Sequence, residues 1–479
     1  MPPPIAAVVC LLFSGYLYWD ELRQPNRQRI SWAPFVWMFL AGSRFASYWV
    51  NLGGPVTRRG YDEGSPVDRA VFFALIIWGA IVLSRRRINW GKLLVENKLL
   101  VLYLLYCLSS IFWTDQPFVL AKRWVKDLGN PIMALVLLTE QKPWEAVGTT
   151  LKRLSFLILP LSVLFIKYYP ELGRGYTPNG SPMYTGVGNQ KNDLGLSCLM
   201  TGMYFAWKLL DRPSGWQALT RGQRATLLVL IGSLIWLLHM ANSQTSNACL
   251  VVATAVLALA RIPSIASRPS RILPFVAAAG LTYVALQATF DINQQVLDLM
   301  GRDETLTNRT SVWESVRKQA GSPIVGTGFM SFWSPARATA VTADLGAIIN
   351  QAHNGYLEQY LNLGSIGVAF VIALMLLTLW RIWPQLDADA RPALLRLCIL
   401  IAAALYNYTE ASFYGINNMW VLLLVASMQT CGAVPVPSAT LAEITPAPPA
   451  PARRPARVLQ DATSPMSIRR RRGSGIRPR

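Results

Sequence analysis

The sequence has few charged residues for its length. Only 15% of its 479 residues are Asp, Glu, Lys or Arg, whereas soluble globular proteins carry about 25%. Hydrophobic residues make up 52% of the chain, and the mean hydropathy is +0.31. This composition excludes an ordinary soluble enzyme. It predicts a membrane protein, in which each spanning helix needs about 20 mostly apolar residues.

Patterns that bind metals or form disulfides are also scarce. The chain has two histidines, His239 and His353, and its six cysteines lie in or beside apolar runs without CxxC spacing. This excludes a histidine metal cage and a disulfide framework, and the cysteines are expected to be buried. No acidic DxD pair stands out in the segments expected outside the membrane, so we predict neither a metal nor another cofactor. No internal repeat is apparent, which disfavours a secondary transporter.

Apolar runs separated by basic or polar breaks are the candidates for transmembrane helices. No positive residues precede the first run, so we expect a span there rather than a cleavable signal peptide. Several runs are shorter than about 17 residues, which makes one or two of them candidates for re-entrant segments. We predict an all-α polytopic membrane protein with about 12–13 transmembrane helices. The runs lie at 3–19, 33–52, 70–84, 99–113, 127–140, 154–169, 193–210, 225–240, 247–262, 272–288, 355–380, 392–408 and 417–431.

The net charge of +20 comes from short basic clusters. Clusters within 85–92, 208–224, 261–271 and 381–396, together with the Arg-rich tail, fall on one side of the membrane if the runs span it in order. The positive-inside rule assigns that side to the cytoplasm. The positive net charge is therefore explained without a nucleic-acid partner, and we expect the tail to contact membrane lipids.

The longest connection between runs covers residues 289–353 and is expected on the periplasmic side. Its charges are nearly balanced, and its stretch SVWESVRKQ has helical spacing, so we expect it to fold against the membrane helices. The predicted organisation is an N-terminal helical bundle (1–288), this loop, C-terminal membrane helices (354–431) and a cytoplasmic tail (432–479). The tail is rich in Pro, Ala and Arg and is expected to be disordered.

Basic residues also occur in segments that the positive-inside rule should deplete of them. They are Lys122 and Arg123, Arg174, Lys191, and Arg309, each beside aromatic or amide side chains. Basic residues retained on the outward side indicate a site for an anion, and the planar guanidinium of Arg matches phosphate oxygens. The alternative is that each one pairs with an outward carboxylate or extends to the membrane interface.

His353 is the candidate catalytic base. It follows the long loop and directly precedes an apolar run, where Asn354 is a plausible helix cap. A neutral imidazole at this interface can take a proton from a hydroxyl group. His239, at the end of another run, lacks a comparable group of cations and is expected to be structural. Gly364 and Gly367, on one helix face, are expected to let a neighbouring helix pack closely.

The spacing of His353-Asn354, Gly364 and Gly367 resembles the signature of the O-antigen ligase family. This family belongs to a superfamily of lipid-linked-glycan ligases, polymerases and protein O-oligosaccharyltransferases. The resemblance covers about residues 30–430. Other stretches that resemble family elements are 113–124, 186–195, 308–313 and 323–329, and two that resemble its exopolysaccharide-production branch are 42–44 and 65–69.

The resemblance implies a GT-C-like glycosyltransferase of the bacterial inner membrane with its active site facing the periplasm. The implied donor is a glycan on undecaprenyl diphosphate, the implied acceptor is a hydroxyl of lipid A core or of a growing polysaccharide, and the reaction is metal-independent and inverting. By position, His353 would be the general base and Arg309 would bind the diphosphate. Further candidates are Lys122, Arg123, Arg174 and Lys191 for the diphosphate, and Asn354 and Trp313 for orienting the acceptor.

Three alternatives to a ligase stay open. A polymerase uses the same donor, and the stretches that resemble the exopolysaccharide branch favour it. A transporter or flippase would need ionisable residues within its spans, where Arg44 is the main candidate. An assembly subunit of a polysaccharide complex would carry an inert His353.

Overall fold

The structure is a computed structural model of the whole chain. It describes residues 1–24, 28–51, 65–176, 180–210, 219–290, 304–346 and 349–430. The chain divides into two units, Met1–Pro435 and Val436–Arg479. The second unit and the whole predicted tail, 432–479, lie outside the described residues.

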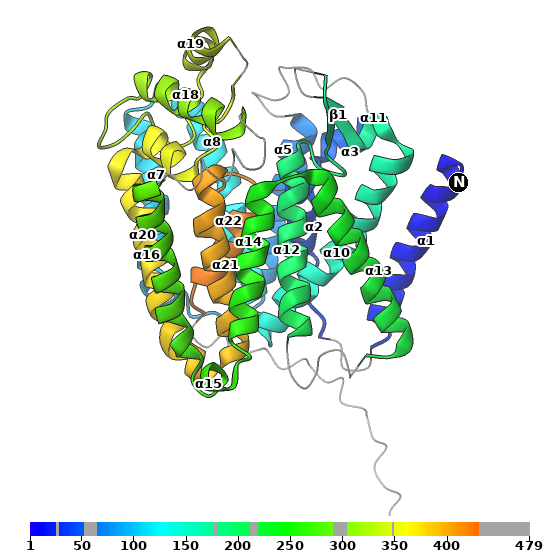
Figure 1. Cartoon of the computed structure of the whole chain (residues 1–479). Helices are drawn as coiled ribbons and strands as arrows, with labels where there is room; N and C mark the ends of the chain where they lie inside the picture. The colour runs from blue at the N-terminus through cyan, green and yellow to red at the C-terminus, as the bar shows by residue number, and fades with distance from the viewer. Residues whose placement is uncertain are drawn as a thin grey trace, which may run out of the picture. The chain divides into compact units, whose positions relative to one another are not determined.

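Helices form almost all of the regular structure in the described part of the chain (Figure 1). The one strand pair there is short and antiparallel and consists of β1 (Arg174–Tyr176) and β2 (Pro182–Tyr184). The predicted all-α class is confirmed. The helices used below are α1 (Pro3–Leu22), α2 (Ala33–Gly42), α3 (Ala46–Asn51), α5 (Pro66–Ser84), α6 (Trp90–Glu96), α7 (Lys98–Ser109), α8 (Pro117–Asp127), α9 (Gly129–Leu138), α10 (Pro143–Tyr168), α12 (Lys191–Leu209), α13 (Arg221–Ala241), α14 (Gln244–Leu259), α15 (Pro263–Ala266), α16 (Ile272–Phe290), α18 (Glu304–Lys318), α19 (Pro335–Leu345), α20 (Gly355–Ala388), α21 (Ala390–Thr409) and α22 (Asn418–Ser427).

Seven helices in the described residues are long and apolar enough to cross a membrane, or eight if the bent pair α6–α7 forms one span. A polytopic membrane protein is therefore confirmed, and the described residues hold fewer helices of this length than the 12–13 spans predicted. The reason is that several apolar runs fold as short helices. The run 33–52 divides at Ser43 into α2 and α3, and α9 and α22 have 10 residues each. Ten helical residues measure about 15 Å, which is half the hydrocarbon core of a bilayer.

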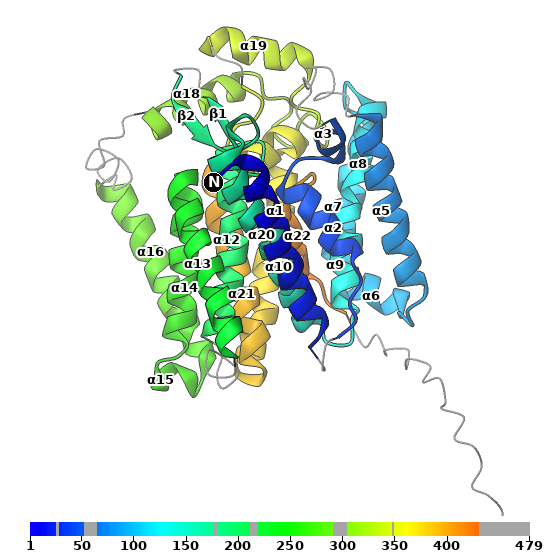
Figure 2. The same ribbon diagram turned by 90° about the vertical axis from the view of Figure 1, so that its right-hand side faces the viewer.

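The described helical unit has two different ends. Helices α3, α18 and α19 and the β1–β2 pair lie together at one end, which we call the loop end (Figures 1 and 2). Helices α6 and α15 lie at the opposite end in Figure 2. The basic residues Arg85–Arg87 precede α6, and Arg261 and Arg268 flank α15, so these clusters are remote from the loop end.

The interior of the unit is built around α21 and α22. Helices α14, α20 and α22 pack along α21, and α12 packs against α10, α13 and α14. All ten residues of α22 are buried, as expected of a helix that is apolar on every side. Helices α13 and α16, in contrast, expose large apolar side chains such as Ile235 and Leu281.

Helix α20 is interrupted one turn before its long apolar part. Gly364 has φ 64°, and residues 323–328 pack into the interruption, where the Ser365 amide donates to the Pro323 carbonyl at 2.9 Å. A Cβ on Gly364 would lie 2.1 Å from the carbonyl oxygen of Ile324. The prediction that this glycine lets a helix pack closely is therefore wrong, because it admits a loop and breaks its own helix.

A separate hydrophobic cluster fastens α18 and α19 to the first turns of α20. The two valines of the SVWESVRKQ stretch lie one helical turn apart in it, as the spacing predicted. The cluster consists of Val312, Val316, Phe332, Val341, Ala352, Leu357 and Leu361. It fixes the chain at Ala352, the residue before His353.

Candidate active site

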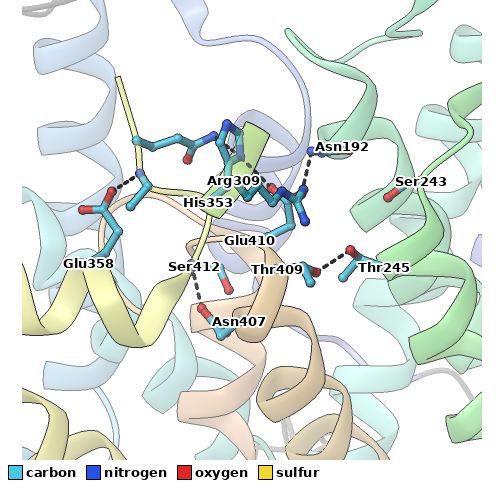
Figure 3. A network of polar contacts seen from close by, with 12 residues as sticks. Asn192, Ser243, Thr245, Arg309, His353, Glu358, Asn407, Thr409, Glu410 and Ser412 are labelled. Carbon is cyan, nitrogen blue, oxygen red and sulfur yellow. Dashed lines mark hydrogen bonds and ion pairs between the residues drawn. The ribbon is translucent and has the colours of Figure 1, made fainter. Parts of the chain in front are cut away.

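His353 lies at the loop end, in the turn that leads into α20 (Figure 3). Its φ of 51° is in the left-handed region, which is uncommon for residues other than glycine. Asn354 caps the helix by accepting from the Leu357 amide at 3.0 Å. The Gly355 amide donates to the backbone carbonyl of Glu410 at 2.8 Å. The turn holds the imidazole, 30% exposed, beside the end of α21.

The carboxylate of Glu410 joins the polar groups of this site. Its side chain is 6% exposed. One oxygen, Oε1, accepts from Nη2 of Arg309 at 3.0 Å and from Nδ2 of Asn192 at 2.7 Å, and Oε2 lies 3.4 Å from Nδ1 of His353 (Figure 3). The start of α12, helix α18 and the turn before α20 therefore meet at one side chain. His353 and Arg309, predicted from separate motifs, are brought together by it.

Glu410 and Asn192 are members of this cluster that sequence reasoning missed. Glu410 lies in the short polar break between the apolar runs 392–408 and 417–431. A carboxylate in so short a break between two membrane segments is a signal of function or of a buried partner. Asn192 directly follows the predicted residue Lys191, and its amide, not the lysine, contacts Glu410.

The side chains of Trp313 and Glu358 hold the backbone just before His353 in place. Nε1 of Trp313 donates to the Ala352 carbonyl at 2.8 Å, and the Ala352 amide donates to Oε1 of Glu358 at 2.6 Å. Glu358 is fully buried and also accepts from Nε1 of Trp333 at 2.9 Å and from the Tyr414 hydroxyl at 2.7 Å. Trp313 therefore positions the His353 turn, and its role towards the acceptor stays a prediction.

A pocket of about 1190 Å³ opens beside the cluster, between α5, α8 and the connections that precede α20 and α22. Its lining combines four cations with four phenylalanines, and we call it the basic pocket. The cations are Arg69, Lys122, Arg123 and Lys126, and the phenylalanines are Phe45, Phe72, Phe73 and Phe118. Two of the predicted diphosphate ligands, Lys122 and Arg123, thus share one wall.

The cations on α8 are held in place by backbone and aromatic groups. Arg123 donates to the Met330 carbonyl, and Nζ of Lys122 lies 4.1 Å from the ring centre of Phe118. Burial lowers the pKa of Lys126, whose Nζ lies 4.8 Å from the rings of two pocket phenylalanines. Cations over aromatic faces next to apolar walls suit a ligand that is both anionic and apolar.

Asp127 is the one carboxylate among the described residues that line the basic pocket. It is 2% exposed, and it accepts from the Gly415 amide at 2.7 Å and from Nδ2 of Asn130 at 3.0 Å. Burial raises its pKa to about 7, although these hydrogen bonds act in the opposite direction. Near neutral pH this carboxyl group is therefore about half protonated, and it offsets only part of the positive charge of the pocket.

Two predicted diphosphate ligands lie elsewhere. Both Nε and Nη2 of Arg174 donate to the Ile166 carbonyl, at 3.0 and 2.8 Å, and the guanidinium lies over the ring of Tyr184. Lys191 is the first residue of α12. Neither side chain lines the basic pocket.

The described residues show neither a metal-binding cluster nor a disulfide. No group of three or more His, Cys, Asp or Glu side chains within the described ranges has an arrangement that could hold a metal ion. Five cysteines, Cys10, Cys107, Cys198, Cys249 and Cys398, are free and buried. Burial of these thiols agrees with the sequence analysis, and a reaction without metal or cofactor stays a prediction.

Two comparisons with known proteins bear on the site. Residues 225–372, which include Arg309 and His353, match the family model described as O-antigen ligase. The chain is also similar to the exopolysaccharide production protein ExoQ of Rhizobium meliloti (strain 1021), with 25% identity over 291 residues. That match covers 58% of this chain and 62% of the relative. The helical membrane fold, the family match and this relative together support the O-antigen ligase and polysaccharide polymerase superfamily.

Proposed function

We propose that this protein is a glycosyltransferase that moves a glycan from undecaprenyl diphosphate to a hydroxyl acceptor at the periplasmic face of the bacterial inner membrane. The observation that carries the proposal is the cluster of His353, Glu410 and Arg309 beside the basic pocket. The family match supports it, because residues 225–372 contain both the histidine and the arginine.

His353 is the proposed general base. In the proposed tautomer Nδ1 carries the proton and faces the Glu410 carboxylate at 3.4 Å, which leaves a lone pair on Nε2. The Gln351 amide, whose Nε2 lies 3.2 Å from the same Nδ1, then has to present its oxygen to this nitrogen. Nε2 takes the proton of the acceptor hydroxyl while the hydroxyl oxygen attacks the anomeric carbon of the donor. The bond from that carbon to the diphosphate oxygen breaks, and attack from the opposite face inverts the configuration. Glu410 stabilises the imidazolium that forms, as the acid of a catalytic triad does.

The proposed place of the donor lipid and its diphosphate is the basic pocket. Departure of the diphosphate concentrates negative charge on its oxygens, and fixed cations stabilise that charge in the transition state. Lys122 and Arg123 supply cations within the pocket, and Arg309 supplies one at the Glu410 cluster. The phenylalanine walls suit the first isoprenoid units. Arg174, bound to the end of α10, is not included in the proposed set.

The acceptor distinguishes a ligase from a polymerase. The name of the relative from Rhizobium meliloti concerns exopolysaccharide production, and the sequence stretches at 42–44 and 65–69 resemble the same branch. Both observations favour a growing polysaccharide as the acceptor over lipid A core. We therefore propose polymerisation of an exopolysaccharide as the more specific form of the function.

The decisive experiment compares His353→Ala and Arg309→Ala with wild type in cells that lack the native gene, at matched protein levels. Loss of the base or of the diphosphate ligand is expected to lower transfer by about 10²–10⁴-fold. Long-chain surface glycan should disappear on gels, and the lipid-linked precursor should accumulate. His239→Ala is the matched control, because His239 is exposed on α13 and remote from the cluster in sequence.

If both variants made surface glycan at the wild-type level, the assignment of His353 and Arg309 to the active site would be wrong. A second experiment distinguishes an enzyme from a transporter. Lipid-linked donor and acceptor are added to purified protein in detergent, where no membrane has to be crossed. An enzyme forms product under these conditions and a flippase forms none. The nature of the product, free polymer or glycan on lipid A core, then separates polymerase from ligase.

A further inference from the structure

A second, smaller cavity adjoins the Glu410 cluster. Its volume is about 200 Å³, and it lies between the end of α2, the start of α12 and the connection from α21 to α22. Most of its polar lining consists of amides and hydroxyls, and we call it the amide pocket. Its polar side chains are Ser43, Asn189, Gln190, Asn192, Asp193, Gln351, Tyr406, Glu410 and Asn417.

The amide pocket reaches the proposed reaction centre directly. Glu410 lines it, and Nε2 of Gln351, another lining residue, lies 3.2 Å from Nδ1 of His353. Phe45, Gln351, Ala411 and Ile416 line both pockets. The two pockets therefore adjoin each other at this group of side chains.

The two pockets differ in charge. Four cations and one carboxylate line the basic pocket. Among the described residues, the amide pocket has two carboxylates, Asp193 and Glu410, and no Lys or Arg side chain in its lining. A diphosphate placed there would face the Asp193 carboxylate and the Glu410 carboxylate, of which the latter is paired with Arg309 from outside the lining. Neutral hydroxyl groups, in contrast, can donate to carboxylates and exchange hydrogen bonds with amides.

We propose that the amide pocket binds one neutral sugar ring of the acceptor glycan and presents its hydroxyl to His353. This inference rests on the proposed function and names the substrate class of its second subsite. The volume agrees with a small group, because pockets for drug-sized ligands measure about 300–1,000 Å³. The carboxylates select against uronic acids and phosphorylated sugars, since a third negative charge in the pocket would be repelled.

Saturation-transfer NMR on the purified full chain in nanodiscs tests the proposal with free D-glucose, D-galactose and D-glucuronate as probes. Binding of undecaprenyl diphosphate is measured on the same samples. Asn189→Trp is the test variant, because Asn189 is exposed at the mouth of the amide pocket and an indole there fills it. Ala121→Trp, which narrows the basic pocket, is the matched variant.

Wild type is expected to give saturation transfer from at least one neutral hexose and at least fivefold less from glucuronate. Asn189→Trp should lose the hexose signal and keep undecaprenyl diphosphate binding, which also shows that it is folded. Ala121→Trp should lose undecaprenyl diphosphate binding and keep the hexose signal. The milder Asn189→Ala should weaken the hexose signal if the Trp variant does not fold.

Four results would overturn the inference: no hexose signal in wild type, an unchanged signal in the folded Asn189 variants, equal signals from glucuronate and hexoses, or displacement of the hexose by undecaprenyl diphosphate. Failure of the proposed function has a different signature. In that case wild type does not bind undecaprenyl diphosphate, whatever the sugar probes show.

Discussion

At the scale of single residues, the site depends on one buried carboxylate. Glu410 accepts from Arg309 and Asn192 through one oxygen and faces His353 with the other. A histidine alone at a helix start is more often structural than catalytic. The carboxylate changes this interpretation, because it can fix the tautomer and the orientation of the imidazole.

Replacement of Glu410 by Gln is expected to lower kcat by about 10²–10⁴-fold, with a smaller change in KM. The amide still accepts a hydrogen bond but no longer stabilises an imidazolium. Transfer from lipid-linked donor to acceptor by purified protein measures the effect. Glu145→Gln is the control, because Glu145 is half exposed and its ion pair with Lys142, at 3.4 Å, lies outside the cluster. A wild-type kcat for Glu410→Gln would remove this carboxylate from the mechanism.

Asp127 gives the fold a pH dependence. Its pKa of about 7 in the folded state is above the ordinary value near 4 in the unfolded state. The folded state therefore binds the proton more tightly, and the stability from this group is complete at low pH and is lost as the pH rises through 7. Between pH 5 and 8, the Tm of wild type in detergent should fall more steeply than that of Asp127→Asn. Parallel curves for the two proteins would contradict the assignment.

At the scale of elements, the broken helix α20 sets the geometry of the site. Residues 323–328 occupy the interruption at Gly364, and the first turns of α20 hold Glu358, which binds the amide of Ala352. The sequence motifs at 323–329 and at 353–367 thus form one packed unit. Their separation in the sequence hides this relationship, because it depends on a backbone conformation that glycine permits.

Gly364→Ala is expected to destabilise the protein by about 3 kcal/mol or more. The new methyl group would combine a positive φ with an approach of 2.1 Å to the Ile324 carbonyl oxygen. Thermal unfolding in detergent measures the loss. Gly232→Ala, on α13 with nothing within 4 Å of its Cβ position, should change stability by less than about 1 kcal/mol. Equal melting of the two variants would show that the interruption is not required.

At the scale of the whole described unit, the loop end and the opposite end differ in their content. Helices α18 and α19 lie at the loop end, and helices α6 and α15 lie at the other (Figure 2). The candidate site includes Arg309 of α18, and the basic clusters adjoin α6 and α15 in the sequence. The positive-inside rule then predicts that the loop end faces the periplasm.

This orientation can be measured by labelling single cysteines in intact cells with a thiol reagent that does not cross the inner membrane. Thr339→Cys, exposed on α19, should be labelled, and Ser267→Cys, exposed after α15, should be labelled only after the membrane is permeabilised. Background from the five described native cysteines should be low because they are buried. The opposite labelling pattern would reverse the predicted topology.

The sequence by itself determined the class of this protein and its main candidate residues. A low charge fraction and long apolar runs indicate a helical membrane protein. The bilayer core offers no hydrogen-bond partners to backbone N–H and C=O groups, and a helix satisfies these groups internally. The order of the runs also predicts an outward position for Arg309 and His353. The sequence does not determine the number of spans, because the same kind of apolar run occurs in a full span and in a short buried helix such as α9 or α22.

Only the tertiary structure decided which of the candidates act together. It joined His353 to Arg309 through Glu410, placed Lys122 and Arg123 in the basic pocket, and bound Arg174 to the backbone of Ile166. It also separated a cationic pocket from an amide-lined one. The physical reason is that each of these relations is a distance between side chains of different helices, and helix packing, not the order of residues, sets such distances.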